Sequence, residues 1–362
     1  MLASASTSTC NKSTICLQPL KTSSNVNYGK RVSLKIKSKA QDFAHNGSAG
    51  QLATSTIRRI LHDDMEMSTL LPAAAMELLT LEGRLMNGGQ IFQQNFLIRS
   101  FDVDPDYKVS IKAIMNYLQD ASVNYRKKMG MSGENLLGHV TPEMSKRDLL
   151  WVYRCMHIKV DRYPSWNDFV QLHHWFSTSG RTGLRCHWVI NDIKTGETLV
   201  RASSLFVMMN KKTRKVCKLP EEVENELKPY QTINAESIVE NERNSCPKVE
   251  TMNHIRNGLT PRWNDLDYNY HVNNSKYVDW ILESVPRSPI HNQELCSINI
   301  EYRRECLKDD VIQSLSKVVT DEQTNHQGIE LEHLLRLESG PEVLRAKTAW
   351  RPKSVCRKSY ED

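Results

Sequence analysis

Apolar positions along the chain follow first a helix-like spacing and then several strand-like runs. Residues 110–131 predict an amphipathic helix, because apolar side chains recur every three or four positions, at Ile111, Ile114, Met115, Leu118, Ala121 and Tyr125. Short apolar runs bounded by turn residues predict strands at 96–101, 149–160, 169–177, 183–192 and 199–210. This part of the chain therefore predicts one helix packed on an antiparallel sheet.

The same order of elements returns further along the chain. A loop and a helix are predicted over 264–285, followed by strands at 296–303, 311–320, 329–337 and 343–351. Two short segments are also alike between the copies, since 196–202 resembles 340–346 and 168–171 resembles 310–313, at similar spacing. Two copies of a helix with an antiparallel sheet make an α+β architecture. A helix wrapped by a curved antiparallel sheet is the hotdog fold, so we predict a tandem (double) hotdog.

The segments outside these two copies differ in composition. Residues 1–59 are rich in Ser, Thr, Asn and Lys and contain one acidic residue, Asp42, which favours an organelle transit peptide over a simple disordered tail. Residues 60–90 are predicted to be an apolar helical lead-in, whose 66–82 patch packs on the domain or touches a membrane surface. We interpret the charged stretch 211–250 as a linker and residues 354–362 as a tail.

Composition narrows the classes of function. The chain has 362 residues with a formal net charge of +6, and it contains no dense Lys/Arg block, so nucleic acid is not an expected partner. The weak positive excess is compatible with an acidic protein partner. The nine cysteines are scattered without a Cys-x-x-Cys pair, which argues against a disulfide framework and a zinc site and favours a reducing compartment. With no glycine-rich nucleotide loop and no metal-ligand cluster, we expect neither a cofactor nor a metal.

Residues 265–274 concentrate the candidate chemistry. They hold two carboxylates, three amides and one imidazole, and they precede the predicted helix, whose N-terminus would favour developing negative charge. His271 is a candidate general base because imidazole titrates near neutral pH. Asn269 could orient a carbonyl group or cap the helix, and Asp267 could orient His271, act as a base or cap the helix. Their alternate spacing could place all three side chains on one side of an extended segment.

Several longer motifs resemble one known family. Residues 91–353 resemble plant acyl-acyl carrier protein (ACP) thioesterases, and within them the FatB-type branch that favours saturated chains. The resemblance rests on Thr141-Pro142-Glu143-Met144, Asp161-Arg162-Tyr163-Pro164-Ser165-Trp166, Val207-Met208-Met209-Asn210, Gly258-Leu259-Thr260-Pro261-Arg262-Trp263, His271-Val272-Asn273-Asn274, Ile281-Leu282-Glu283-Ser284 and Glu301-Tyr302-Arg303-Arg304-Glu305-Cys306. Together these motifs are specific, whereas each alone would be weak.

The resemblance implies a function and a site. It implies hydrolysis of the acyl-ACP thioester in the plastid stroma, with an acyl-binding hotdog at 91–210 and a catalytic hotdog at 251–353. The implied catalytic residues are Asp267, Asn269, His271, Glu305 and Cys306. The acyl tunnel is expected to be lined by Met115, Leu118, Met131, Leu136 and Leu137. Cys306 could act as a nucleophile or be a packed small hydrophobe. We favour a water activated by Glu305 and His271, because the resemblance to hotdog enzymes implies no covalent intermediate and adjacent strand residues point to opposite faces.

The implied partner is the acyl carrier protein. A homodimer is also possible, although the two hotdog copies within one chain already resemble a hotdog dimer. Basic residues that could meet the carrier are Arg181, Lys211, Lys212, Arg214 and Lys215, with a solvated charged face as the alternative. The chain departs from the family at Tyr270, Ser275 and Asp279, where Gln, a small apolar residue and Gly are usual, and in a short segment before Ile91. These departures keep open a non-catalytic acyl-binding or regulatory hotdog protein. An acyl-CoA thioesterase is a further alternative, and a hydroxyacyl dehydratase is disfavoured.

Overall fold

The computed structural model describes residues 83–131, 140–232, 252–286, 292–319 and 328–353. Its strands are β1 (Arg84–Met86), β2 (Ile91–Leu97), β3 (Leu149–Val160), β4 (Phe169–Ser179), β5 (Gly183–Asp192), β6 (Thr198–Asn210), β7 (His254–Leu259), β8 (Gln293–Tyr302), β9 (Ile312–Val319), β10 (Ile329–Leu337) and β11 (Glu342–Pro352). Its α-helices are α4 (Ile111–Lys128), α5 (Pro142–Lys146), α6 (Glu221–Leu227) and α7 (Lys276–Glu283). Three short 3-10 helices are η1 (Asn87–Gly89), η2 (Lys228–Tyr230) and η3 (Trp263–Asp265).

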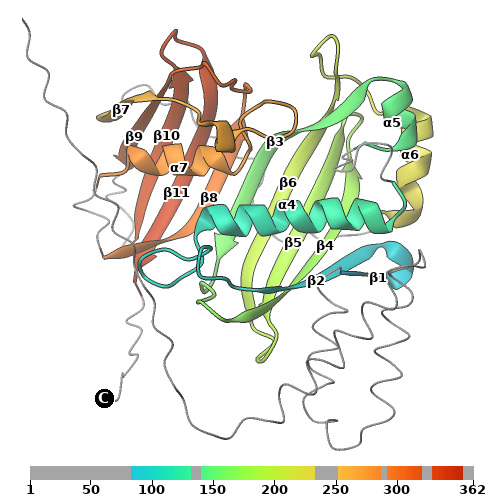
Figure 1. Cartoon of the computed structure of the whole chain (residues 1–362), viewed down its shortest axis with the longest axis horizontal. Coiled ribbons are helices and arrows are strands. Elements are labelled where there is room, and N and C mark those ends of the chain that lie inside the picture. Colours follow the sequence, from blue (N-terminus) through green and yellow to red (C-terminus); the bar gives the residue numbers. More distant parts are fainter. Residues whose placement is uncertain (1–82, 132–139, 233–251, 287–291, 320–327, 354–362) are drawn as a thin grey trace, which may run out of the picture. The chain divides into compact units, whose positions relative to one another are not determined.

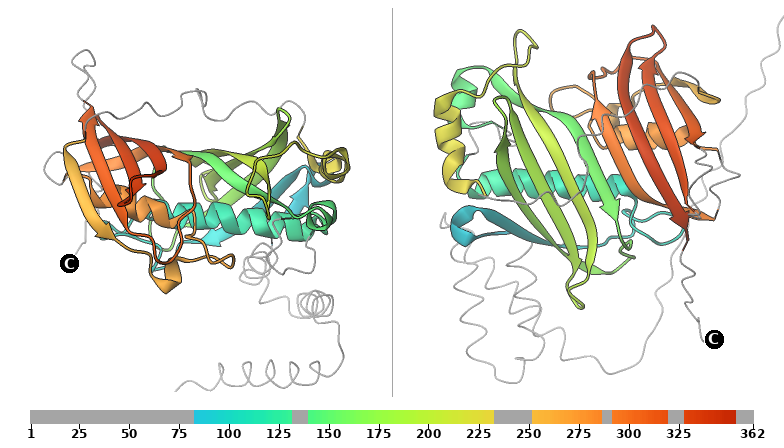
Figure 2. Two further views of the ribbon diagram at one scale, coloured as in Figure 1. Left: turned by 90° about the horizontal axis from the view of Figure 1, so that it is seen from above. Right: turned by 180° about the vertical axis from the view of Figure 1, so that it is seen from behind.

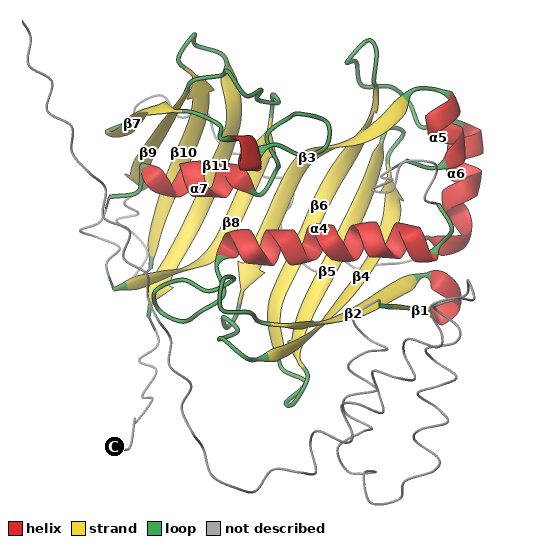
Figure 3. Ribbon diagram, viewed as in Figure 1, coloured by secondary structure: helices red, strands yellow, loops and turns green. Residues whose placement is uncertain are grey.

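All eleven of these strands form one sheet with the order β1-β2-β4-β5-β6-β3-β8-β11-β10-β9-β7. Reading outward from the centre, β3-β6-β5-β4-β2 and β8-β11-β10-β9-β7 are the same arrangement, with helix α4 between β2 and β3 in one copy and helix α7 between β7 and β8 in the other (Figure 3). The similar segments noted above begin equivalent strands, since 168–171 leads into β4 and 310–313 leads into β9. The prediction of a double hotdog is confirmed.

The two copies join through β3 and β8, which pair antiparallel with Cys155 opposite Glu301 and Lys159 opposite Ser297. Because the pair is antiparallel, the start of β3 and the end of β8 meet at the same end of the sheet. There, Arg154 donates a hydrogen bond to the carbonyl oxygen of Tyr302 at 2.9 Å. Residues of both copies thus come together where the chain leaves β8.

Helices α4 and α7 lie on one face of the sheet (Figures 1 and 2). Helix α4 begins after Ser110, whose side chain accepts the N–H of Ala113, and it buries Ile114, Leu118 and Tyr125 to 1% exposure or less. Burial of each such large apolar side chain contributes about 1.5–3 kcal/mol. Helix α7 likewise buries Tyr277, Val278, Trp280 and Ile281. Among the described helices, none combines the length and the apolar character that crossing a membrane requires.

Several predicted boundaries need correction. Of the strand predicted at 96–101, only Phe96 and Leu97 belong to β2, which begins at Ile91 and ends at Leu97. Its residues pair with β1 on one side and β4 on the other. The end of the predicted helical lead-in is β1 and a 3-10 helix, while residues 60–82 lie outside the described residues. Strand β7 was not predicted, because its burial pattern is mostly exposed.

The predicted linker also begins too early. Residues 211–232 form a turn, α6 and a 3-10 helix, and Val223 and Leu227 are buried in the core at 0% and 4% exposure. Only two apolar positions of this acidic helix face the core, so its periodicity was too weak to recognise. The predicted transit segment 1–59, the patch 66–82, residues 233–251 and the tail 354–362 lie outside the described residues and stay predictions.

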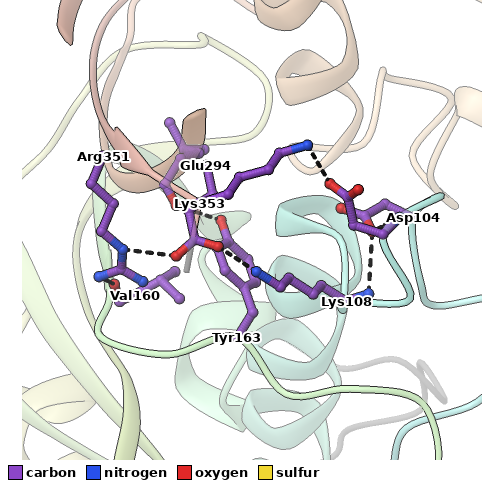
Figure 4. Close-up of polar contacts among 9 residues, drawn as sticks. Asp104, Lys108, Val160, Tyr163, Glu294, Arg351 and Lys353 are labelled. Atoms are coloured by element: carbon purple, nitrogen blue, oxygen red, sulfur yellow. Dashed lines mark hydrogen bonds and ion pairs between the residues drawn. The ribbon is translucent and has the colours of Figure 1, made fainter. Parts of the chain in front are cut away.

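A polar cluster joins the copies at the opposite end of the β3–β8 pair (Figure 4). The Glu294 carboxylate lies 2.6 Å from Lys108 Nζ and 2.8 Å from Arg351 Nε, and its side chain is 9% exposed. Tyr163 donates its hydroxyl to the carbonyl of Leu295 at 2.7 Å, and Arg351 donates to the carbonyl of Val160 at 3.0 Å. The copies are therefore held by the largely buried Lys108–Glu294 ion pair and by two hydrogen bonds to backbone carbonyls, as well as by the sheet.

Candidate active site

The motif between β7 and α7 folds as a tight hairpin turn and not as the extended segment we predicted. Leu266 and Val272 form an isolated antiparallel bridge, and the N–H of Asp267 donates to the carbonyl of His271 at 2.7 Å. The three-residue loop closes with Tyr270 at φ 60°, in the left-handed region. A turn followed by a left-handed residue is a common three-residue hairpin connection. Asn269 therefore sits in the turn and not at a helix N-cap.

The Asp267 carboxylate builds this turn. Its Oδ1 accepts the backbone N–H of Asn269 at 2.8 Å and that of His271 at 3.2 Å. The carboxylate accepts the N–H groups of the residues two and four positions later. These hydrogen bonds satisfy backbone N–H groups in the turn and stabilise it. In this structure, the Asp267 carboxylate bonds the backbone of His271 and so holds the turn that carries the imidazole.

The loop after β8 brings Glu305 to His271. The N–H of Val272 donates to the carbonyl of Cys306 at 2.9 Å, so the two loops are joined beside the candidate residues. His271 Nε2 lies 3.5 Å from Glu305 Oε2, and the two side chains are 28% and 42% exposed. Arg214, from the turn after β6, forms an ion pair with the same Oε2 atom. An imidazole and a carboxylate at this separation can share a proton or a bridging water.

These groups line a cavity of about 1190 Å³, larger than the roughly 300–1,000 Å³ of ordinary small-molecule pockets. Its walls come from both copies, including Trp151 and Tyr153 of β3, Phe206 of β6, and the motif turn. The cations that line it are Arg126, Arg154, Lys211, Arg214, Arg303 and Arg304, against the carboxylates Asp148, Asp267 and Glu305. The excess of positive charge favours an anionic ligand.

Asn273 caps the start of α7. Its Oδ1 accepts the N–H and the hydroxyl of Ser275, both at 3.0 Å, and its carbonyl accepts the N–H of Lys276 at 3.0 Å. Two of the first amides that we expected to stabilise negative charge are therefore already bonded within the chain. The side chain of Asn269, which is exposed in the turn and lines the cavity, is the better-placed amide.

Cys306 lies in the hydrophobic core and is not among the residues that line the cavity. It is 0% exposed, and burial raises the pKa of its thiol to about 11. A thiol with this pKa is almost fully protonated at neutral pH, whereas a nucleophilic cysteine needs the thiolate. The backbone of Cys306 helps to hold the site together. Its carbonyl accepts the N–H of Val272, and its own N–H donates to the Tyr277 hydroxyl at 3.1 Å. The geometry does not support a nucleophilic Cys306.

We expect Cys306 to resist alkylation in the folded protein. A buried, protonated thiol reacts slowly, so iodoacetamide at neutral pH should leave Cys306 unmodified until the protein is unfolded. Mass mapping of peptides from native and unfolded protein checks this, with the half-buried Cys217 as an internal comparison. Rapid native labelling of Cys306 would contradict its placement in the core.

The predicted tunnel residues are only partly brought to the cavity. Met115 and Leu118 are buried in the core at 1% and 0% exposure, and neither lines the large cavity. Met131 lines a separate, small apolar cavity of about 10 Å³, which shares Arg126, Val140 and Trp151 with the large one. Leu136 and Leu137 lie outside the described residues. A tunnel role of Met115 and Leu118 stays a prediction, because helical spacing shows which face is buried and not which part of that face is hollow.

Several residues that line the cavity are not evident from the sequence. Arg126, Tyr153 and Tyr302 line the cavity, and Arg214 contacts Glu305, although we named Arg214 only as a basic residue that could meet a carrier. For Arg214, the sequence offered one indication, which is the turn-forming Asn210 followed by a run of basic residues. Within the described ranges, no group of three or more His, Cys, Asp or Glu side chains is arranged to hold a metal ion.

The protein is thus a double hotdog protein in which an imidazole and a carboxylate lie beside a large cavity. This arrangement is an acid–base site between the two copies. Residues 89–227 match the model of the acyl-ACP thioesterase N-terminal domain, and residues 249–352 match that of the C-terminal domain. The chain belongs to the acyl-ACP thioesterase family, as its motifs predicted.

The chain is also similar in sequence to known plant acyl-ACP hydrolases. The chain is 47% identical over 275 residues to a chloroplastic acyl-ACP hydrolase of Cuphea viscosissima, a match covering 75% of this chain and 66% of the relative. It is 49% identical over 267 residues to a chloroplastic dodecanoyl-ACP hydrolase of Cinnamomum camphora, covering 73% of this chain and 69% of that protein. The chain thus spans about two thirds of the length of these relatives.

Solved structures agree on the fold. A 12:0-ACP thioesterase from Umbellularia californica is 45% identical, with a TM-score of 0.68, covering 73% of this chain and 95% of that one. An acyl-ACP thioesterase from Bacteroides thetaiotaomicron has a TM-score of 0.60 at 19% identity, covering 74% of this chain and 100% of that one. At such low identity, the second match speaks for the fold alone.

Proposed function

We propose that the protein hydrolyses the thioester of acyl-ACP and releases a free, saturated fatty acid, which ends chain elongation in the plastid. The observation that carries the proposal is the contact of His271 Nε2 with Glu305 Oε2 at 3.5 Å, beside a cavity that both copies line. Family membership supports the reaction class. The names of the relatives, which include chloroplastic palmitoyl- and dodecanoyl-ACP enzymes, support the saturated substrate and the plastid.

In the proposed reaction, Glu305 and His271 activate a water. The water oxygen attacks the carbonyl carbon while its proton passes to this pair, and the Asn269 amide donates a hydrogen bond to the carbonyl oxygen as negative charge develops there. The C–S bond then breaks, and the leaving thiolate takes a proton from the pair, giving the fatty acid and the free carrier thiol. Asp267 holds the turn in which Asn269 and His271 are placed.

The cations of the cavity support a substrate whose carrier is negatively charged. Lys211, Arg304 and their neighbours surround the cavity, and a surface of this sign attracts an acidic protein and the phosphate of its prosthetic arm. This is the specific reason to prefer acyl-ACP over an uncharged thioester. Acyl-CoA also carries phosphates, so it is the natural comparison substrate.

We expect the full-length protein to release thiol from saturated acyl-ACP substrates with a higher kcat/KM than from acyl-CoA of the same chain length. Thiol release can be followed with a chromogenic disulfide over a series of chain lengths, and the free acid identified by mass spectrometry. Faster turnover of acyl-CoA would show that the protein is an acyl-CoA thioesterase and would contradict the proposed acyl-ACP substrate. A folded protein that binds acyl chains without releasing thiol would instead favour the acyl-binding reading.

A further inference from the structure

One carboxylate oxygen of Glu305 is shared by two partners from different copies. Oε2 contacts His271 Nε2 at 3.5 Å and also pairs with the guanidinium of Arg214, which lies in the N-terminal copy. We propose that Arg214 is a positioning residue that holds Glu305 in the orientation needed for catalysis, an inference that rests on the proposed function. The N-terminal copy then contributes to the acid–base site as well as to the cavity wall.

The turn that carries Arg214 is held from several sides. The Asn210 side chain accepts the N–H of Lys212 at 3.1 Å and of Thr213 at 2.9 Å, and its carbonyl accepts the N–H of Arg214 at 2.9 Å. Arg214 itself has φ 54°, a left-handed conformation that is uncommon for a residue with a side chain. Such conformations persist where the surroundings over-determine them, and they cluster at functional sites.

The start of β3 fastens the same turn. The N–H of Lys211 donates to the carbonyl of Asp148 at 2.7 Å, and Lys212 Nζ lies 2.6 Å from the Asp148 carboxylate. Strand β3 is also the strand that pairs with β8, which leads into Glu305. The position of Arg214 relative to Glu305 is therefore set by a short and rigid path through the sheet.

Glu305 needs such a partner because its own loop does not fix it. The side chain is 42% exposed and follows the end of β8, so its rotamers would otherwise exchange freely in water. A guanidinium is planar, always charged and suited to carboxylates, so it restricts the rotamer of Glu305. Since both contacts within the described residues involve Oε2, Oε1 can face the attacking water.

The test is a double-mutant cycle with Arg214→Met and Glu305→Gln in the full-length protein. The substrate is a neutral acyl thioester of N-acetylcysteamine, so that loss of a cation cannot act through carrier docking. We expect R214M to lower kcat about 100-fold, the scale of a misplaced catalytic group, with little change in KM. In the E305Q background, R214M should add almost nothing, because Arg214 acts through Glu305.

Three comparisons make the outcome decisive. Arg214→Lys should recover part of kcat, since it restores a cation without the planar fork. Arg162→Met removes an arginine that bridges Asp192 and Glu197 away from the cavity, and it should leave kcat unchanged. Arg214→Gln serves as the neutral variant if thermal melting shows that R214M is unfolded. Additive losses in the cycle, or an unchanged kcat in R214M, would overturn the inference, whereas an inactive wild type would overturn the proposed function itself.

Discussion

Replacing His271 by alanine is expected to lower kcat on acyl-ACP by about 100-fold to 10,000-fold, the range for a general acid or base. The imidazole lies 3.5 Å from Glu305, and in the proposed reaction the pair both accepts the proton of the water and returns one to the thiolate. Alanine leaves the backbone of the turn in place, because Asp267 bonds the N–H of residue 271 and not its side chain. The loss should therefore appear in kcat more than in KM.

The matched variant is Cys306→Ala. It removes a buried thiol that does not line the cavity and keeps the carbonyl that Val272 bonds, so most of the turnover should remain. Single-turnover assays on acyl-ACP and intact-mass measurement of the quenched enzyme distinguish the mechanisms. An acyl group trapped on wild-type Cys306, together with inactivity of C306A, would restore the covalent mechanism. Full activity of H271A would remove His271 from the site.

Much of the fold could be predicted because local signals agreed with the tertiary structure. The spacing of Ile114, Leu118 and Tyr125 predicted α4, since the same face of the helix is buried against the sheet. The likeness of 168–171 to 310–313 predicted the duplication, since both segments begin equivalent strands. Strands β1 and β7 were missed because they lie at the two edges of the sheet, where one side is unpaired and burial leaves a weak pattern.

The candidate site was only partly predictable. The residue types in the motif turn pointed to His271 and Asn269, and family resemblance added Glu305. The resemblance also placed Cys306 in the site, but chain order cannot show that its carbonyl and N–H are used while its thiol faces the core. Arg214 lies 91 positions from Glu305 in the sequence and reaches it only because β3 pairs with β8. Contacts of this kind depend on sheet register, which local patterns do not contain.

The Glu294 carboxylate, far from the candidate active site, helps to hold the two copies together. We expect Glu294→Ala to lower the free energy of unfolding by about 3–5 kcal/mol, the cost of removing one partner from a buried ion pair. Glu294 is 9% exposed and contacts Lys108, which is 17% exposed, and Arg351, which is 33% exposed (Figure 4). Without the carboxylate, the largely buried Lys108 ammonium loses its counter-ion and is left beside the Arg351 guanidinium.

The neighbouring Lys353–Asp106 pair provides the control, because its distance is a similar 2.7 Å while its side chains are 36% and 48% exposed. Asp106→Ala should cost no more than about 1 kcal/mol, as for other exposed pairs. Urea unfolding of both variants, followed by fluorescence and circular dichroism, gives the two values. A triple variant, Glu294→Leu with Lys108→Met and Arg351→Met, should recover stability, because well-packed apolar groups replace buried ion pairs at little or no cost. Equal losses in E294A and D106A would contradict this argument, since burial would then not be what makes Glu294 important.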